Sequence, residues 1–235
     1  MRIGVPHMGN IYVPFKALFQ RLDIDCVIPP LNNQRTLSLG AKYSPEGLCL
    51  PFKLTTGNLI EAAELGADTL LMPSGYGICR LGYYAKTQQQ ILYDLGYNNV
   101  EVVGVGISEH KLFGLLQTIK RLSNNAPWPR IISALRFGLK KLDAIDRIER
   151  VVHKVRAVER VKGTANQLFS QAIKDIDALD DYPALKRTQA DYIEQLDQVS
   201  KDNQTQPLII GIVGEFYVVL EPFSNLDVES ELGKL

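Results

Sequence analysis

The sequence has no net charge, few cysteines and no long apolar run. Its 26 Lys and Arg residues balance its 26 Asp and Glu residues, so the charge does not indicate nucleic acid or an anionic membrane as a partner. No apolar run approaches the roughly 18 residues that a membrane span needs. The chain does not open with a basic region followed by an apolar one. These absences predict a cytoplasmic protein.

Familiar catalytic and nucleotide-binding motifs are also missing. The chain contains no G-x-S-x-G, H-E-x-x-H or Walker A pattern, which leaves serine hydrolases, zincins and P-loop proteins without support. Gly4 and Gly9 do not form the G-x-G-x-x-G fingerprint of dinucleotide binding. Three cysteines, an odd number, argue against a disulfide framework in a cytoplasmic chain. The thiols are therefore expected to be buried and free, or to bind a metal.

The first half of the chain alternates short apolar runs with amphipathic segments. At 235 residues and 46% hydrophobic content, the chain can bury one large core or two small ones. Strands are expected at Arg2–Pro6, Asp25–Pro29, Thr69–Met72 and Val100–Val105. The helices between them favour an α/β fold, a Rossmann-like parallel sheet with right-handed crossovers, over residues 1–108.

The second half changes character. Residues 109–206 contain no convincing strand and predict a helical segment, with one helix before the A-P-W-P element and three or more after it. Pro207–Val213 (P-L-I-I-G-I-V) again has the pattern of a buried strand, and a helix is expected at Leu226–Leu232. A lone strand–helix unit cannot bury both faces as a parallel-sheet domain. We therefore expect residues 207–235 to begin a second α/β domain that this chain contains only in part.

Two cysteines occupy matching positions before predicted helices. Cys49 is followed by Leu50 and Pro51, and proline is favoured in a first helical turn. Cys79 follows the loop P-S-G-Y-G and directly precedes Arg80. Free N–H groups and the positive end of the helix dipole stabilise a thiolate at such positions. Both loops are expected at the carboxyl ends of the strands, where open parallel sheets bind ligands, and thiolates select iron–sulfur clusters, zinc or copper(I).

The residues alone leave two interpretations of these thiols open. Two cysteines separated by a helix are no recognised metal spacing, and zinc or a cluster usually takes four ligands. Free cysteine is also among the most buried residue types, so two structural thiols are an equal alternative. Gly77 would let a cluster sulfide approach the backbone or would only form a tight turn. Arg80 would offset an anionic cluster or would only be solvated.

Several other polar residues are assigned structural roles. Cys26 is expected to pack as a small hydrophobe within its strand. Tyr83 and Tyr84 are expected to pack with their hydroxyls in water. His7 follows the first strand, and a loop histidine is more often neither ligand nor acid. His153 lies in the helical segment with no cysteine nearby.

The segments around Cys49 and Cys79 resemble a known family. The stretches S-P-E-G-L-C-L-P-F-K and G-x-G-x-C-R-x-G-Y-Y, followed by I-L-x-D-L-G and V-E-V-V-G, look like the 2-hydroxyacyl-CoA dehydratase superfamily. The likeness is greatest to its activase-related, D-component-like branch. The later stretch I-I-G-I-V-G-E-F-Y-V-V-L-E-P-F-S-N resembles the start of that family's second Rossmann-like domain.

The resemblance implies an iron–sulfur cluster, either 4Fe-4S or double-cubane 8Fe-9S. It makes Cys49 and Cys79 the ligands in this chain and places Gly77 and Arg80 beside the cluster. It also implies low-potential electron transfer to a substrate in an interdomain cleft, in a lyase or reductase component loaded by an ATP-hydrolysing activator of the actin/hexokinase-like fold. Because no cysteine follows Cys79, the ligand set is incomplete, and a missing C-terminal region, a homodimer or a second subunit would supply the rest. The alternative is a cluster-free α/β binding or partner-stabilising subunit with structural cysteines.

Overall fold

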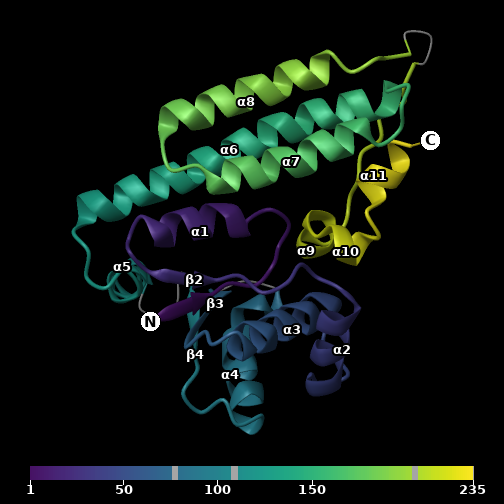
Figure 1. Cartoon of the computed structure of the whole chain (residues 1–235). Coiled ribbons are helices and arrows are strands. Elements are labelled where there is room, and N and C mark those ends of the chain that lie inside the picture. Colours follow the sequence, from purple (N-terminus) through teal and green to yellow (C-terminus); the bar gives the residue numbers. More distant parts are fainter. Residues whose placement is uncertain (76–78, 107–110, 203–205, 235) are drawn as a thin grey trace. The chain divides into compact units, whose positions relative to one another are not determined.

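The protein, seen as a computed structural model, divides into two compact units, Met1–Leu135 and Arg136–Leu235. The structure describes residues 1–75, 79–106, 111–202 and 206–234. Figure 1 labels the elements of both units. No helix in these ranges has the length and apolar character that crossing a membrane requires.

The first unit is built on a parallel sheet. Its strands are β1 (Arg2–Gly4), β2 (Asp25–Val27), β3 (Thr69–Pro73) and β4 (Glu101–Val105). They form a four-stranded sheet in the order β2-β1-β3-β4, with every pair parallel. The predicted Rossmann-like α/β fold is therefore confirmed. β1 and β2 end before Pro6 and Pro29, because proline has no N–H for the ladder.

Helices cover both faces of this sheet (Figure 1). They are α1 (Tyr12–Gln20), α2 (Gln34–Tyr43), α3 (Leu50–Glu64), the 3-10 turn η1 (Arg80–Tyr83), α4 (Tyr84–Asp94), α5 (Lys111–Leu122) and the start of α6 (Trp128–Val158). Adjacent strand residues point to opposite faces. Leu71 packs with Phe19 of α1 and Ile131 of α6, whereas Leu70 packs with Leu59 of α3 and Leu92 of α4.

Two glycines let α2 and α3 approach each other closely. A Cβ on Gly40 would lie 1.7 Å from a backbone carbonyl oxygen of α3, and one on Gly57 would lie 2.0 Å from the carbonyl oxygen of Thr36. The buried Glu61 accepts hydrogen bonds from Thr36 Oγ1 at 2.9 Å and Arg35 Nη1 at 2.8 Å. The two helices therefore pack backbone to backbone, and the one buried carboxylate between them has partners.

The outer edge of β4 is closed by a side chain. Gln89 of α4 accepts a hydrogen bond from the N–H of Val102 at 2.6 Å and donates one to the carbonyl of Val100 at 2.9 Å. One amide thus replaces a neighbouring strand along this part of the edge.

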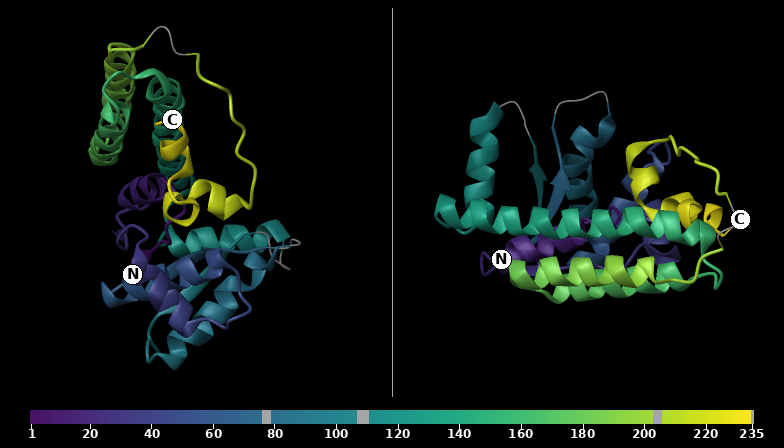
Figure 2. Two further views of the ribbon diagram at one scale, coloured as in Figure 1. Left: turned by 90° about the vertical axis from the view of Figure 1, so that its right-hand side faces the viewer. Right: turned by 90° about the horizontal axis from the view of Figure 1, so that it is seen from above.

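The second unit is helical. It contains the remainder of α6, α7 (Thr164–Ala178), α8 (Tyr182–Asp197), α9 (Phe216–Leu220), α10 (Pro222–Asn225) and α11 (Val228–Leu232). Figure 2 shows α6, α7 and α8 running alongside one another. The prediction of three or more helices after the A-P-W-P element is confirmed. The division of the chain at residues 108 and 206 stays a prediction.

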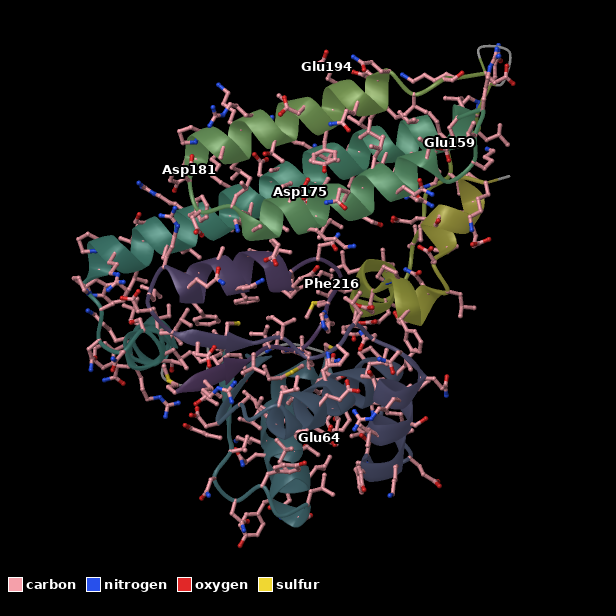
Figure 3. All side chains as sticks on the ribbon, in the orientation of Figure 1. Glu64, Glu159, Asp175, Asp181, Glu194 and Phe216 are labelled. Carbon is pink, nitrogen blue, oxygen red and sulfur yellow. The ribbon has the colours of Figure 1, made fainter. Side chains whose placement is uncertain are left out.

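Both ends of α7 are held by charged side chains from α6 and from the residue that follows it. The carboxylate of Glu159, labelled in Figure 3, accepts hydrogen bonds from the N–H groups of Gly163 at 2.6 Å and Ala165 at 2.7 Å. Lys141 Nζ donates to the carbonyl oxygen of Asp177 at 2.9 Å. A negative charge at the helix start and a positive charge at its end both complement the helix dipole.

The segment Pro207–Val213 forms no strand, so that prediction is wrong. It has neither helix nor strand structure, and its apolar side chains are exposed, Ile209 by 102% and Val213 by 97%. A strand needs a neighbour for its backbone hydrogen bonds, and the described part of the second unit contains no other strand. The predicted helix near the chain end is present as α11, and α9 and α10 were not predicted.

We expect Gly40→Ala to lower the melting temperature. Alanine is favoured over glycine inside a helix by about 1 kcal/mol, but overpacking typically costs about 1–3 kcal/mol, and the added methyl would strike backbone that cannot rotate away. Thermal unfolding followed by circular dichroism measures the effect. Gly47→Ala is the control, because a Cβ there meets nothing within 4 Å. An unchanged melting temperature for Gly40→Ala would contradict the close helix approach.

Candidate functional site

Both candidate cysteines lie at helix starts on one edge of the sheet. Cys49 is the N-cap of α3, and Cys79 is the N-cap of η1. The last residues of α3 precede the start of β3, and β3 is parallel to the other strands. The first residues of α3 therefore lie at the opposite end of the sheet, beside the carboxyl ends of the strands. Cys79 lies in the connection that leaves the carboxyl end of β3. The predicted helix-start positions are confirmed, and this is the edge where parallel sheets bind ligands.

Arg80 ties the two cysteine loops together. Its Nη1 donates a hydrogen bond to the carbonyl oxygen of Gly47 at 3.1 Å, so the residue after Cys79 is joined to the loop before Cys49. The sequence allows Arg80 either a role beside a cluster or simple solvation, and it does not predict this bond between the two loops. Gly77 lies outside the described residues.

Tyr84 contacts the thiol of Cys49. Its hydroxyl lies 2.6 Å from Cys49 Sγ, and the residue is only 3% exposed. Its ring meets Phe52 edge-on, with ring centroids 4.9 Å apart. The expectation that Tyr84 packs is confirmed, but the expectation that its hydroxyl faces water is wrong. Tyr83, by contrast, is 71% exposed.

The connection that carries Cys79 is tightly packed at its described ends. A Cβ on Gly82 would lie 2.2 Å from the carbonyl oxygen of Gly75, and one on Gly106 would lie 1.6 Å from that of Ser74. Ser74 Oγ also donates to the carbonyl oxygen of Gly82 at 3.3 Å. Glycine is therefore required where these backbone segments meet, and the contact limits where Cys79 can lie.

A buried polar layer supports Tyr84 from one helical turn away. Gln88 Nε2 donates to Thr55 Oγ1 at 3.0 Å and to Thr56 Oγ1 at 3.3 Å. All three residues are buried. Because Gln88 lies four residues after Tyr84 on α4 and both threonines lie on α3, this layer holds the tyrosine hydroxyl and the thiol in fixed register.

Two thiols supply half of the usual ligands of an iron–sulfur cluster, which takes four. Among the described residues, neither Cys49 nor Cys79 belongs to a group of three or more Cys, His, Asp or Glu ligands. Cys26 packs against the apolar core as expected. His7 is 2% exposed, and its Nε2 bonds the carbonyl oxygen of Pro29 at 2.7 Å. At this edge the described residues therefore offer two thiols, Cys49 and Cys79, toward the four ligands that a cluster takes.

One comparison with known proteins is informative. Residues 2–87 match a family model described as "CoA enzyme activase uncharacterised domain". The first part of the chain is therefore similar to a domain found in CoA enzyme activases. The matched region contains both cysteine loops and Tyr84. No curated protein and no solved structure matched. The resemblance is thus supported at the level of the activases, and the D-component-like assignment stays a prediction.

We expect a bifunctional thiol reagent to link Cys49 to Cys79 in the native protein and to leave Cys26 unlinked. The bond from Arg80 to Gly47 holds the two loops together, whereas Cys26 lies within β2. Peptide mass spectrometry identifies the linked pair. Arg80→Ala should lower the yield several-fold. Arg121→Ala is the control, because Arg121 pairs with Glu101 instead, and an equal loss of yield there would contradict the role of Arg80.

Proposed function

We propose that the chain is an iron–sulfur component of a CoA enzyme activase system, in which Cys49 and Cys79 bind the cluster. The observation that carries the proposal is the pair of thiols at two helix starts, joined by the bond from Arg80 to Gly47 within the region that matches the activase family. The family match supports a role in the activation of a partner enzyme. The roles of the two thiols rest on the residues themselves.

The surrounding groups suit an anionic cluster. Helix-start N–H groups favour negative charge beside both thiolates. The Tyr84 hydroxyl is placed to donate to Cys49 Sγ, and hydrogen bonds to ligand sulfurs tune cluster potentials. Arg80 adds a positive charge, and Gly77, by resemblance, would allow close approach. When bound, the cluster would supply one-electron transfer at low potential.

The remaining ligands would come from a second copy of the chain. Two chains carrying Cys49 and Cys79 offer four thiolates, the number that a 4Fe-4S cluster takes. A double-cubane 8Fe-9S cluster is the other type that the resemblance implies. An ATP-hydrolysing activator of the actin/hexokinase-like fold would load the electron, and the chain would pass it on in a lyase or reductase component whose substrate lies in an interdomain cleft.

A cluster-free subunit is the second candidate. It is favoured by the contact between Cys49 and the buried Tyr84 hydroxyl, which gives the thiol a hydrogen-bond partner within the fold. In that case both cysteines are structural, and the chain binds or stabilises a partner without electron transfer.

Iron and acid-labile sulfide, measured after reconstitution without oxygen, separate the two candidates. A 4Fe-4S cluster shared by two chains gives about two irons and about two sulfides per chain, and sedimentation should show a dimer that forms on loading. Cys49→Ser and Cys79→Ser should each lose the iron, whereas Cys26→Ser should keep it. Absence of iron would refute the cluster proposal. Iron in a monomer would refute the shared cluster alone and leave a partner subunit as the source of ligands.

We expect Tyr84→Phe to make the potential of the loaded protein more negative. Removing a hydrogen bond to a ligand sulfur destabilises the more negatively charged, reduced cluster, while the phenyl ring keeps the packing against Phe52. A redox titration followed by electron paramagnetic resonance gives the midpoint. Tyr83→Phe is the matched control because Tyr83 is exposed, and equal potentials in all three proteins would exclude Tyr84 from the site.

A further inference from the structure

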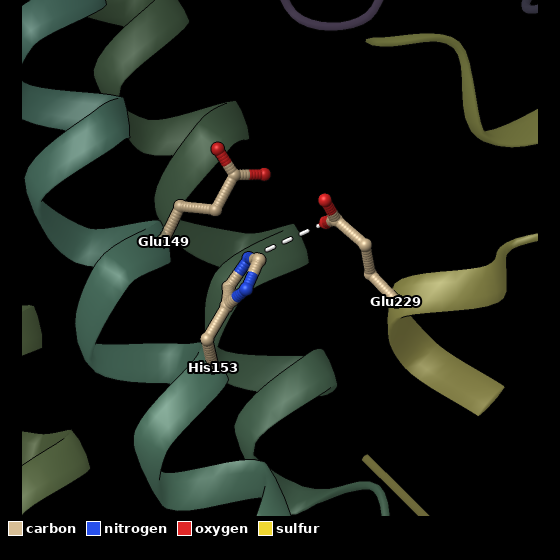
Figure 4. A group of neighbouring side chains, drawn as sticks. All are labelled: Glu149, His153 and Glu229. Carbon is tan, nitrogen blue, oxygen red and sulfur yellow. Dashed lines mark ion pairs between the residues drawn. The ribbon is translucent and has the colours of Figure 1, made fainter. Parts of the chain in front are cut away.

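The second unit contains its own group of metal-ligand side chains. Glu149 and His153 lie four residues apart on α6 and therefore on one face of the helix, and Glu229 comes from α11. One ligand atom from each lies within 4.8 Å of the others. Figure 4 shows the three side chains converging from the two helices. No other group of three or more such residues occurs in the described ranges of the chain.

We propose that Glu149, His153 and Glu229 bind a divalent cation of the zinc class. The set offers one imidazole nitrogen and two carboxylate groups. Oxygen-only sites suit magnesium or calcium, whereas an imidazole shifts the preference to zinc and its first-row neighbours. Three protein ligands leave one position of a tetrahedral ion for water or a bound molecule.

The spacing of the ligand atoms is close to what such an ion needs. Ligands about 2.1 Å from a tetrahedral zinc lie about 3.4 Å from one another. His153 Nε2 and Glu229 Oε2 are 3.4 Å apart. The ligand atoms of the full group lie within 4.8 Å of one another, and the three rotatable bonds of the Glu149 side chain allow a bound ion to draw them closer.

The ion pair between His153 and Glu229 does not explain why the carboxylate of Glu149 lies beside them. Within the described part of the chain its carboxylate has no hydrogen bond and no ion pair. Glu149 is partly buried, and one of its carboxylate oxygens lies within 4.8 Å of the ligand atoms of His153 and Glu229. A partly buried carboxylate facing a second carboxylate is stabilised by a bound cation.

His153 is the exposed member of the three. An imidazole coordinates a metal through the lone pair of one ring nitrogen.

A buried network holds Glu229 opposite His153. Arg156 Nε donates to Asn166 Oδ1 at 2.7 Å, and its Nη1 donates to the carbonyl oxygen of Glu229 at 3.1 Å. Asn166 Nδ2 donates to Ser230 Oγ at 2.8 Å. Arg156 is 7% exposed and Ser230 is 4% exposed. The backbone at Glu229 is thus held against α6 and α7 by protein hydrogen bonds alone. Similar hydrogen bonds orient the ligands in known metal sites.

Imidazole NMR signals test the proposal directly, because the chain has only three histidines. Zn²⁺ is titrated into the reduced, full-length protein, and His153→Gln assigns the signal. We expect the His153 signal to shift saturably with zinc. Glu149→Gln and Glu229→Gln should each weaken that binding by at least about 10-fold. Asp143→Asn is the matched control on α6, since Asp143 pairs with Arg147 instead.

Zinc that binds to the cysteine thiols does not affect this measurement, because the measured quantity is the NMR signal of the His153 imidazole. The site stands independently of the proposed cluster, so serine at both Cys49 and Cys79 should leave the His153 shift unchanged while iron binding is lost. Thermal unfolding followed by circular dichroism, which reports on the helices of the second unit, shows whether each variant is folded. A His153 signal that does not shift under excess zinc would overturn the proposal. So would a zinc-dependent shift that is the same in the folded Glu149→Gln and Glu229→Gln variants as in the unsubstituted protein.

Discussion

The close approach of α2 and α3 is the constraint on which the cysteine edge depends. Gly40 and Gly57 remove the side chains that would separate the two backbones, although glycine costs up to about 1 kcal/mol at each helical position. Packing and the bonds from Thr36 and Arg35 to the buried Glu61 offset that cost. Since α3 is held along most of its length, its first residue has little freedom, and that residue is preceded by Cys49.

A different set of contacts positions Cys79 at the same edge. Cys79 is placed by glycine contacts at the described ends of its loop and by the bond from Arg80 to Gly47. The buried layer around Gln88 joins α3 to α4 and keeps Tyr84 against Cys49. Both halves of the thiol pair are therefore organised by protein contacts alone. A ligand that binds there would meet a preformed edge, which lowers the ordering cost of binding.

Local signals predicted much of the fold. Pro51 in the first turn of α3 marked the helix start after Cys49, and Gly66 and Gly96, both with positive φ, marked the ends of α3 and α4. Pattern alone failed at Pro207–Val213, because an apolar run does not reveal whether a neighbouring strand exists to pair with it. The alternation of strands and helices succeeded in the first unit because each strand there has such a neighbour.

The candidate sites were less predictable because their contacts join distant parts of the sequence. The contact of Tyr84 with Cys49 depends on how α4 packs against α3, which no local pattern encodes. The sequence shows no cysteine near His153, but its neighbours in the structure are carboxylates. One of them, Glu229, comes from a helix far along the chain. The i, i+4 spacing of Glu149 and His153 was the one signal available in the sequence.

The amide of Gln89 has a consequence for how the sheet can grow. An open parallel edge is a template on which any extended chain can add itself, including another copy of the same protein. At β4 an incoming strand would first have to displace both bonds that Gln89 makes to Val100 and Val102. A single uncharged side chain from α4 thus makes association at this part of the edge unfavourable.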